Sequence, residues 1–383
     1  MSETQYSGIL ELEDRGRGKI RTISKDFAPS HKDVRISPKV ISEFGLREGC
    51  FITGVSQRKG KNLESVRIDT VNDLPPEHFK DVPELTKQIA IPPNERLVLE
   101  TSDPTTRILD LIAPIGRGQR ALIVAPPRSG KTVLMQRMAQ AVSKNYPELE
   151  MLILLVDERP EEVTEMERAT QAKVFASSND RDFASHSRIA RLTLEYAKRK
   201  AEVGKDIVIL LDSLTRVGRA YNAGMKGSGR IMSGGIDARA LEIPKRIFGA
   251  SRNIEDGGSL TIIATILVDT GSRMDELIFQ EFKGTGNSEI VLDRELSDQR
   301  IFPALNIQLT GTRREELLLG DDTELHFRLR RALLEGGKRD AMQGLQNLVR
   351  RTRSNKELLE YIKSNDKLDL VQPRRASRKE MEF

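Results

Sequence analysis

The sequence has no tryptophan, one cysteine and only 4% aromatic residues, so we expect a mostly aliphatic core. The lone cysteine, Cys50, excludes an internal disulfide and is typical of a reducing compartment, which favours a cytoplasmic location. The four histidines are scattered singly along the chain, and their spacing does not suggest a zinc site.

Long apolar runs are also missing. No stretch approaches the ~20 apolar residues of a transmembrane helix, so we expect no membrane span. The first residues, MSETQYSG, show no basic segment followed by an apolar run, and we expect no secretory signal. We also expect no helical segment ahead of the first strand, because strand-like alternation begins at residue 8.

What is present is charge. The 62 basic and 57 acidic residues leave a net charge of +5, which permits a polyanionic partner without establishing one. A length of 383 residues suggests two or three domains.

Residues 1–75 predict a small β-barrel. Short strand-like runs separated by turns occupy this region, including residues 8–12, 33–37 and the hairpin-like pair 50–55 and 65–69. The natural candidate is an OB-fold, a barrel that commonly binds single-stranded nucleic acid through basic and aromatic residues.

Four basic residues alternate along one predicted strand of this barrel: Arg15, Arg17, Lys19 and Arg21. In a strand they would share one face. They could protect an exposed sheet edge, or they could follow the phosphates of a nucleic acid, and the sequence favours neither reading.

Five prolines lie between residues 73 and 93, a composition typical of a linker, which we place at residues 76–93. We expect a second domain at residues 94–363 and a charged tail at 364–383. In the second domain apolar strands alternate with helices, which predicts a mostly parallel sheet covered on both faces. Strands are expected at 121–125, 151–156, 207–211 and 260–268, further β structure at 288–293 and 304–309, and helices at 133–144, 159–169, 185–202, 236–250, 323–335 and 338–363.

The most informative motif is residues 121–132, ALIVAPPRSGKT. A turn ending in Gly-Lys-Thr between a strand and a helix predicts a phosphate-binding loop, because Gly130 allows close approach and the helix N-terminus attracts anions. Lys131 would reach the β- and γ-phosphates of ATP, and the Thr132 hydroxyl would bind Mg²⁺. A chance Gly-Lys-Thr on a surface turn is the alternative, and Ala125 stands where the motif usually begins with glycine. The residues expected to contact the nucleotide are Pro127, Arg128, Ser129, Gly130, Lys131, Thr132 and Val133.

Two further predicted strands end in acids. Asp212 follows one of them and is expected in the Mg²⁺ shell, although an aspartate there could also cap the next helix. Asp157 and Glu158 follow the other, and either could orient and deprotonate an attacking water, or both could cap the following helix. Transition-state charge also needs an arginine, but composition does not choose among Arg294, Arg300, Arg313 and Arg314.

Two glycine-rich loops follow the Asp212 strand, at residues 223–235 and 269–274. Long loops in compact domains are usually functional or disordered. In a ring-shaped motor these loops could line a pore and hold a nucleic-acid backbone.

Several long blocks resemble the bacterial transcription termination factor Rho family. They are ALIVAPPRSGKT, VDERPEEVTEME, ILLDSLTRVGRAYN, GSGRIMSGGIDA, PKRIFGASRN, GGSLTIIATILVDTGSRMDE, EFKGTGN and GTRREELLL. The resemblance implies a RecA-like P-loop ATPase domain preceded by a small OB-fold barrel, assembled as a homohexameric ring. It also implies hydrolysis of ATP with Mg²⁺, translocation 5′ to 3′ on single-stranded RNA and release of RNA polymerase.

By position, the resemblance implies that Glu158 activates the water. It implies that Arg313 is a finger supplied by the neighbouring subunit and that Arg300 is a second intersubunit arginine. Phe302 would pack on adenine. The implied pore-loop residues are Arg230, Ser233 and Gly234 in the first loop and Arg273 in the second.

The barrel departs from the family pattern. Where relatives have GFGFLR this chain has residues 16–21, GRGKIR, and Arg35 replaces a tyrosine. Base stacking supplies ~1–3 kcal/mol per base. An RNA site made of Arg17, Lys19, Arg21 and Arg35 should therefore be more salt-dependent and less base-selective.

Two other functions remain compatible with the sequence. One is an adaptor that binds nucleic acid and keeps ATP as a structural ligand. The other is a related rotary or protein-export ATPase, which shares the phosphate loop but does not predict GSGRIMSGG.

Overall fold

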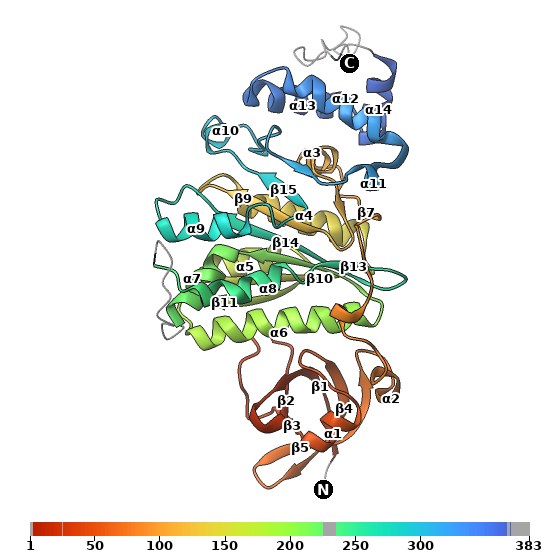
Figure 1. Cartoon of the computed structure of the whole chain (residues 1–383), viewed down its shortest axis with the longest axis vertical. Helices are drawn as coiled ribbons and strands as arrows, with labels where there is room; N and C mark the ends of the chain where they lie inside the picture. The colour runs from red at the N-terminus through yellow and green to blue at the C-terminus, as the bar shows by residue number, and fades with distance from the viewer. Residues whose placement is uncertain (1–2, 25, 225–234, 366–367, 369–383) are drawn as a thin grey trace, which may run out of the picture.

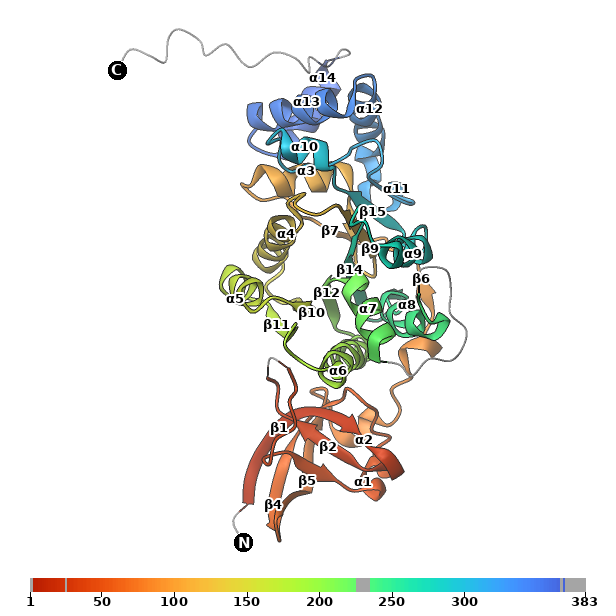
Figure 2. The same cartoon turned by 90° about the vertical axis from the view of Figure 1, so that its left-hand side faces the viewer.

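The computed structural model describes residues 3–24, 26–224, 235–365 and 368. A small barrel lies at one end of the molecule, a helix-covered sheet fills the middle, and the last helices lie at the other end (Figures 1 and 2). None of the helices in these described ranges is both long and apolar enough to cross a membrane.

The N-terminal barrel is closed, with strand order β1-β2-β3-β5-β4. Its only parallel pair among these strands is β3 with β5, and the inward side chains, such as Leu10, Ile20 and Ile52, form a separate buried cluster. This arrangement confirms the predicted barrel. Its elements are β1 (Glu3–Leu12), η1 (Asp14–Gly16), β2 (Gly18–Arg21), β3 (Val34–Ile36), α1 (Pro38–Glu43), β4 (Phe51–Lys59) and β5 (Asn62–Val71).

The central sheet has the order β11-β10-β12-β14-β9-β15-β16. From β11 to β15 in this order, each strand is parallel to its neighbours. The last strand in the order, β16, pairs antiparallel with β15. The strands are β9 (Arg120–Ala125), β10 (Glu150–Glu158), β11 (Lys173–Ser178), β12 (Asp206–Asp212), β13 (Arg252–Ile254), β14 (Ser259–Leu267), β15 (Ser288–Val291) and β16 (Gly311–Thr312).

Both faces of the sheet are covered, which explains why its strands are nearly continuous apolar runs. Alternate residues of β9 enter different clusters: Ala121 and Ile123 pack with α3, α4 and α5, whereas Leu122 and Val124 pack with α6 to α9. These helices are α3 (Pro104–Ile112), α4 (Lys131–Asn145), α5 (Pro160–Ala169), α6 (Phe183–Glu202), α7 (Leu214–Gly224), α8 (Glu242–Phe248) and α9 (Arg273–Phe282).

Some local predictions were wrong. The helix expected at 338–363 is two helices, α13 (Lys338–Arg351) and α14 (Asn355–Ser364), and the Ser354 side chain caps the second by accepting from the Glu357 N–H at 3.1 Å. The helix expected at 236–250 is the 3₁₀ helix η3 (Ala238–Leu241) followed by α8, and β11 was not predicted.

The remaining elements are β7 (Arg96–Leu97), β8 (Ile115–Gly116), α10 (Arg294–Asp298), α11 (Glu316–Leu319), η4 (Gly320–Asp322) and α12 (Thr323–Leu334).

The proline-rich segment 76–93 is not a free linker. It contains α2 (Pro76–Phe79), η2 (Leu85–Lys87) and β6 (Ala90–Ile91), and β6 pairs with β13. The backbone N–H of Leu85 donates to Glu202 at the end of α6, at 2.7 Å. The segment therefore runs along the domain of the central sheet and is held to it.

Helix α6 joins the barrel to the central sheet. Its Arg188 and Arg191 pair with Glu11 of β1 at 3.5 and 2.9 Å, and Arg191 also pairs with Glu48. At Gly49, where φ is 86°, an added Cβ would lie 2.2 Å from the Glu195 carbonyl carbon of α6. The barrel thus contacts the helix backbone directly, which only glycine permits here.

We expect Gly49→Ala to destabilise the protein by about 2–4 kcal/mol, because the methyl group would collide with α6 and the backbone conformation is strained. Urea unfolding followed by circular dichroism, together with limited proteolysis between barrel and sheet, measures this. Gly60→Ala is the matched control: its φ is also positive, at 64°, but nothing lies within 4 Å of the added atom. Equal effects of the two substitutions would contradict the proposed close contact.

Candidate functional site

The turn between β9 and α4 has a fixed shape. Gly130, at φ 89°, is the N-cap of α4. Three hydrogen bonds hold the preceding residues: the Ser129 hydroxyl donates to the Pro126 carbonyl at 2.8 Å, and α10 supplies the other two. These run from Arg294 to the Pro127 carbonyl at 2.6 Å and from Ser297 to the Arg128 carbonyl at 2.8 Å.

A cavity of about 670 Å³ opens beside this loop. Its volume and its position at a helix N-terminus suit the phosphates of a nucleotide. Residues 126–133 line it together with Arg159, Glu162, Arg216, Leu267, Ser297, Arg300 and Phe302.

Lys131 faces two acids at the carboxyl ends of neighbouring parallel strands. Its ammonium lies 2.5 Å from both carboxylate oxygens of Asp212 and 3.7 Å from Glu158. The Thr265 hydroxyl, from β14, donates to Asp212 at 2.7 Å and fixes that carboxylate. Strand pairing of β10 with β12 brings these groups together, because equivalent strand ends meet at one edge of the sheet.

Glu158 is the more buried of the two adjacent acids on β10. Only 1% of it is exposed, and burial, followed by the nearby Asp212 carboxylate, raises its pKa to about 7. Asp157 is partly exposed and its φ of 59° turns the chain at this point. The geometry places Glu158, rather than Asp157, beside Lys131.

Arg216 forms an ion pair with the Glu158 carboxylate and was missed by the sequence analysis. Its Nε lies 3.2 Å from Glu158, and its guanidinium also donates to the backbone carbonyl of Asp157. Its position in the first turn of α7, the helix that follows Asp212, was the available signal, but many surface arginines occupy such positions. Thr265 was missed because it lies inside the buried, mostly apolar strand β14, where the sequence does not distinguish it from a core residue.

The residues present fit a nucleotide with Mg²⁺. Within the described ranges no group of three or more His, Cys, Asp or Glu side chains could hold a metal ion alone. Magnesium usually binds through one or two protein ligands together with phosphate oxygens and waters, and Thr132 and Asp212 could supply those protein ligands.

A second, apolar cavity of about 310 Å³ adjoins the phosphate loop and suits a flat base. Phe302 and Val133 line it, and both side chains are about half exposed, at 46% and 53%. A Cβ on Gly130 would lie 3.6 Å from the Phe302 ring, so ring and loop are in close proximity.

The two arginines expected from a neighbouring subunit lie in different places. Arg300 lines the cavity of its own chain, and its expected role from a neighbouring subunit stays a prediction. Arg313 is exposed beyond β16 and donates to the Gly284 carbonyl at 3.4 Å. In the described part of the chain, Arg313 does not line the cavity beside its own phosphate loop.

A groove of about 380 Å³ on the barrel brings together three of the predicted RNA-binding residues. Lys19 on β2 pairs in register with Arg35 on β3, and Arg17 lies at the end of the preceding turn. Arg17 and Arg35 are exposed. The alternating basic run therefore provides part of a cationic surface.

Arg21 does not belong to this surface, so its predicted contact with RNA was wrong. It is 4% exposed and forms buried ion pairs with Glu11 and Asp33. The outer face of β2 is partly exposed at Lys19, but at Arg21 it is covered by Glu11 and Asp33, and Glu11 also pairs with Arg191 of α6.

The predicted pore-loop residues are described only in part. Arg273 is exposed at the first position of α9. Arg230, Ser233 and Gly234 lie outside the described residues.

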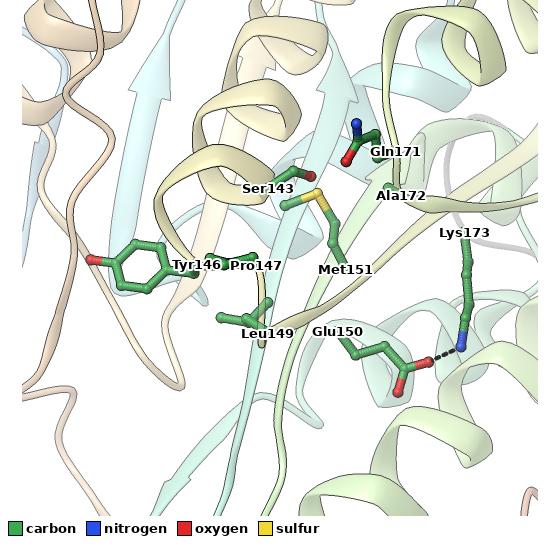
Figure 3. A pocket seen from close by; sticks show the side chains of 9 residues that line it. All are labelled: Ser143, Tyr146, Pro147, Leu149, Glu150, Met151, Gln171, Ala172 and Lys173. Atoms are coloured by element: carbon green, nitrogen blue, oxygen red, sulfur yellow. Dashed lines mark hydrogen bonds and ion pairs between the residues drawn. The ribbon is translucent and has the colours of Figure 1, made fainter.

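A further cavity of about 210 Å³ lies at the amino ends of β10 and β11, opposite the strand ends that carry Asp212 and Glu158. Figure 3 shows its two charged residues, Glu150 and Lys173, turned toward each other. Glu150 also accepts from the Tyr196 hydroxyl at 2.6 Å. Because its charges are already paired, this cavity is a weaker candidate than the one at the phosphate loop.

Comparison with known proteins identifies two regions. Residues 105–310 match the family described as "ATP synthase alpha/beta family, nucleotide-binding domain", and residues 6–77 match "Rho termination factor, RNA-binding domain". Among solved structures, an ATPase from the type III secretion system of pathogenic bacteria has a TM-score of 0.59 at 19% identity, covering 72% of this chain and 86% of its own. That likeness shows the fold alone.

Several relatives are more similar to this chain in sequence than that ATPase is. The transcription termination factor Rho of Streptomyces lividans is 50% identical over 93% of this chain, which spans 51% of that relative. The Rho of Cereibacter sphaeroides is 48% identical over 94% of this chain and 87% of its own length. The Rho of Aquifex aeolicus is 49% identical over 93% and 84%.

The raised pKa of Glu158 has a consequence for stability. Between its ordinary value of 4.5 and the folded value of about 7, the folded protein binds more protons than the unfolded chain, so this residue lowers stability as pH rises through that window. We therefore expect Glu158→Gln to stabilise the protein by about 2 kcal/mol more at pH 8 than at pH 5. Chemical denaturation at both pH values tests this, with the exposed Glu161→Gln as control; a gain independent of pH would contradict it.

Proposed function

Because the chain belongs to the transcription termination factor Rho family, we propose that it is an ATP-driven motor that acts on nascent RNA and terminates transcription. The observation that carries this proposal is the placement of Lys131 between Asp212 and Glu158 in a chain that also has a cationic barrel groove. Its partners would be single-stranded RNA and RNA polymerase, and its place of action the cytoplasm.

Nucleotide binding would use the loop and the apolar cavity together. The backbone N–H groups at the start of α4 and the Lys131 ammonium would hold the phosphates, and Phe302 and Val133 would flank the base. Thr132 and Asp212 would hold Mg²⁺, which when bound supplies positive charge to the phosphate oxygens. Lys131 would exchange Asp212 for phosphate as the nucleotide enters, which leaves the Asp212 carboxylate available to the metal shell.

Glu158 would act as the general base. Its pKa of about 7 lies near the working pH, where a carboxylate both ionises and accepts a proton effectively. It would take a proton from the water that attacks the γ-phosphate, and Arg216 would keep the carboxylate oriented toward that water. Arg300 would add positive charge from the same chain.

Arg313 would complete the site of a neighbouring copy. It is exposed and away from its own phosphate loop, so a ring of copies is the arrangement that gives it a catalytic role. We propose a homohexamer, in which Arg273 and the segment holding Arg230, Ser233 and Gly234 face the RNA.

The function is tested by ATP hydrolysis with and without single-stranded RNA. We expect RNA to stimulate hydrolysis, and Glu158→Gln to lower kcat by about 100-fold or more, because general-base catalysis typically contributes that much. Glu161→Gln, on the exposed first turn of α5, should retain activity. Absence of RNA stimulation would contradict the motor, and termination activity retained by Glu158→Gln would favour an adaptor.

The shared site is tested by mixing inactive variants. Lys131→Ala and Arg313→Ala should each abolish hydrolysis, whereas a mixture reassembled from the two should regain activity. In a randomly mixed ring about a quarter of the interfaces would combine an intact Lys131 with an intact Arg313 from the next copy. Arg314→Ala, at the adjacent exposed arginine, is the control and should stay active. A mixture no more active than either variant would contradict a site shared between copies.

A further inference from the structure

The barrel groove contains acids as well as bases. Three cationic side chains line it, those of Arg17, Lys19 and Arg35, and two carboxylates lie among them, Glu13 and Glu64. A surface that holds RNA only by attracting phosphates would not be expected to carry these acids, because each carboxylate repels a phosphate.

Lys19 is already engaged by one of these acids. Its ammonium lies 2.6 Å from Glu13, and the two side chains are 29% and 36% exposed. Glu13 lies directly after β1, and its backbone N–H donates to the Arg17 carbonyl at 2.7 Å. The turn therefore fixes the backbone of Glu13, whose carboxylate lines the groove beside the cation that a phosphate would need.

The other carboxylate is arranged differently. Glu64 on β5 is in parallel register with Arg35 on β3, but it forms its ion pair, at 3.4 Å, with Lys59 at the end of β4. Arg17 and Arg35 form no side-chain ion pair within the described ranges. Lys19 is therefore the cation of the groove whose charge is most directly compensated.

The geometry points to Glu13 as an affinity-limiting residue of the RNA groove: it occupies Lys19, so that a phosphate must compete with it. This inference rests on the proposed RNA-binding function and adds a residue to it. Because the Glu13–Lys19 pair is partly exposed, it is weak enough for RNA to displace, yet its carboxylate still opposes phosphate binding. Neutralising Glu13 should strengthen binding.

The test measures binding of fluorescent oligo(rC) and oligo(rA) to the full chain by anisotropy over a range of salt concentrations. We expect Glu13→Gln to tighten binding about fivefold at low salt, because the substitution removes one exposed carboxylate that repels the phosphates. The slope of log K against log salt should steepen by about 0.7, the amount for one added phosphate contact on a single strand. Glu77→Gln, which removes the same charge from α2 outside the groove, should change neither.

A double-mutant cycle separates the specific effect from a change in net charge. Lys19→Gln should weaken binding only slightly in the natural sequence, where Glu13 already engages Lys19, and several-fold more in the Glu13→Gln background. If Lys19→Gln had the same effect in both backgrounds, or if Glu13→Gln did not tighten binding, the inference would be overturned while RNA binding itself stood. If the natural chain bound neither oligomer and RNA did not stimulate hydrolysis, the proposed function would fail first.

Discussion

One ammonium group organises the centre of this molecule. Lys131 lies between the carboxylates of Asp212 and Glu158, which come from two neighbouring strands and would otherwise place like charges together in a buried site. The shared cation, with Arg216 on the other side, makes this arrangement possible, while burial still raises the pKa of Glu158 to about 7. A buried carboxylate with a raised pKa lowers stability at neutral pH, and such perturbed groups are common at functional sites.

The second constraint is the position of α6. One side of this helix packs on the sheet whose strand ends carry Asp212 and Glu158, and the other side receives the barrel through Glu11, Glu48 and Gly49. Glu11, which pairs with Arg188 and Arg191 of α6, also pairs with the buried Arg21, whereas Lys19 two residues away stays partly exposed. The proposed RNA surface therefore includes Lys19 and leaves out Arg21, and we propose that Glu13 limits how strongly this surface binds RNA.

Most of the site was predictable because its chemistry follows strand ends. A loop between strand and helix, and an acid after each of two apolar strands, predict groups that meet at one edge of a parallel sheet. The unpredicted parts depend on contacts between distant segments. Arg216 is recognisable only because it lies 3.2 Å from Glu158, and Thr265 only because its hydroxyl donates to Asp212 at 2.7 Å. The break at residues 352–354 was missed because local hydrophobic periodicity continues across it.

By itself, the sequence determined the closed barrel, the parallel sheet and the identity of the phosphate loop, because these follow from local periodicity and from short motifs with fixed geometry. It could not choose between Asp157 and Glu158 by chemistry, nor separate Arg21 from Lys19 on one alternating strand. Tertiary structure decided both, for the same physical reason: burial and pairing depend on which surface is covered by another element. Packing leaves Lys19 partly exposed and buries Arg21 against the barrel's acids, and it places Glu158 beside Lys131 while Asp157 stays partly exposed.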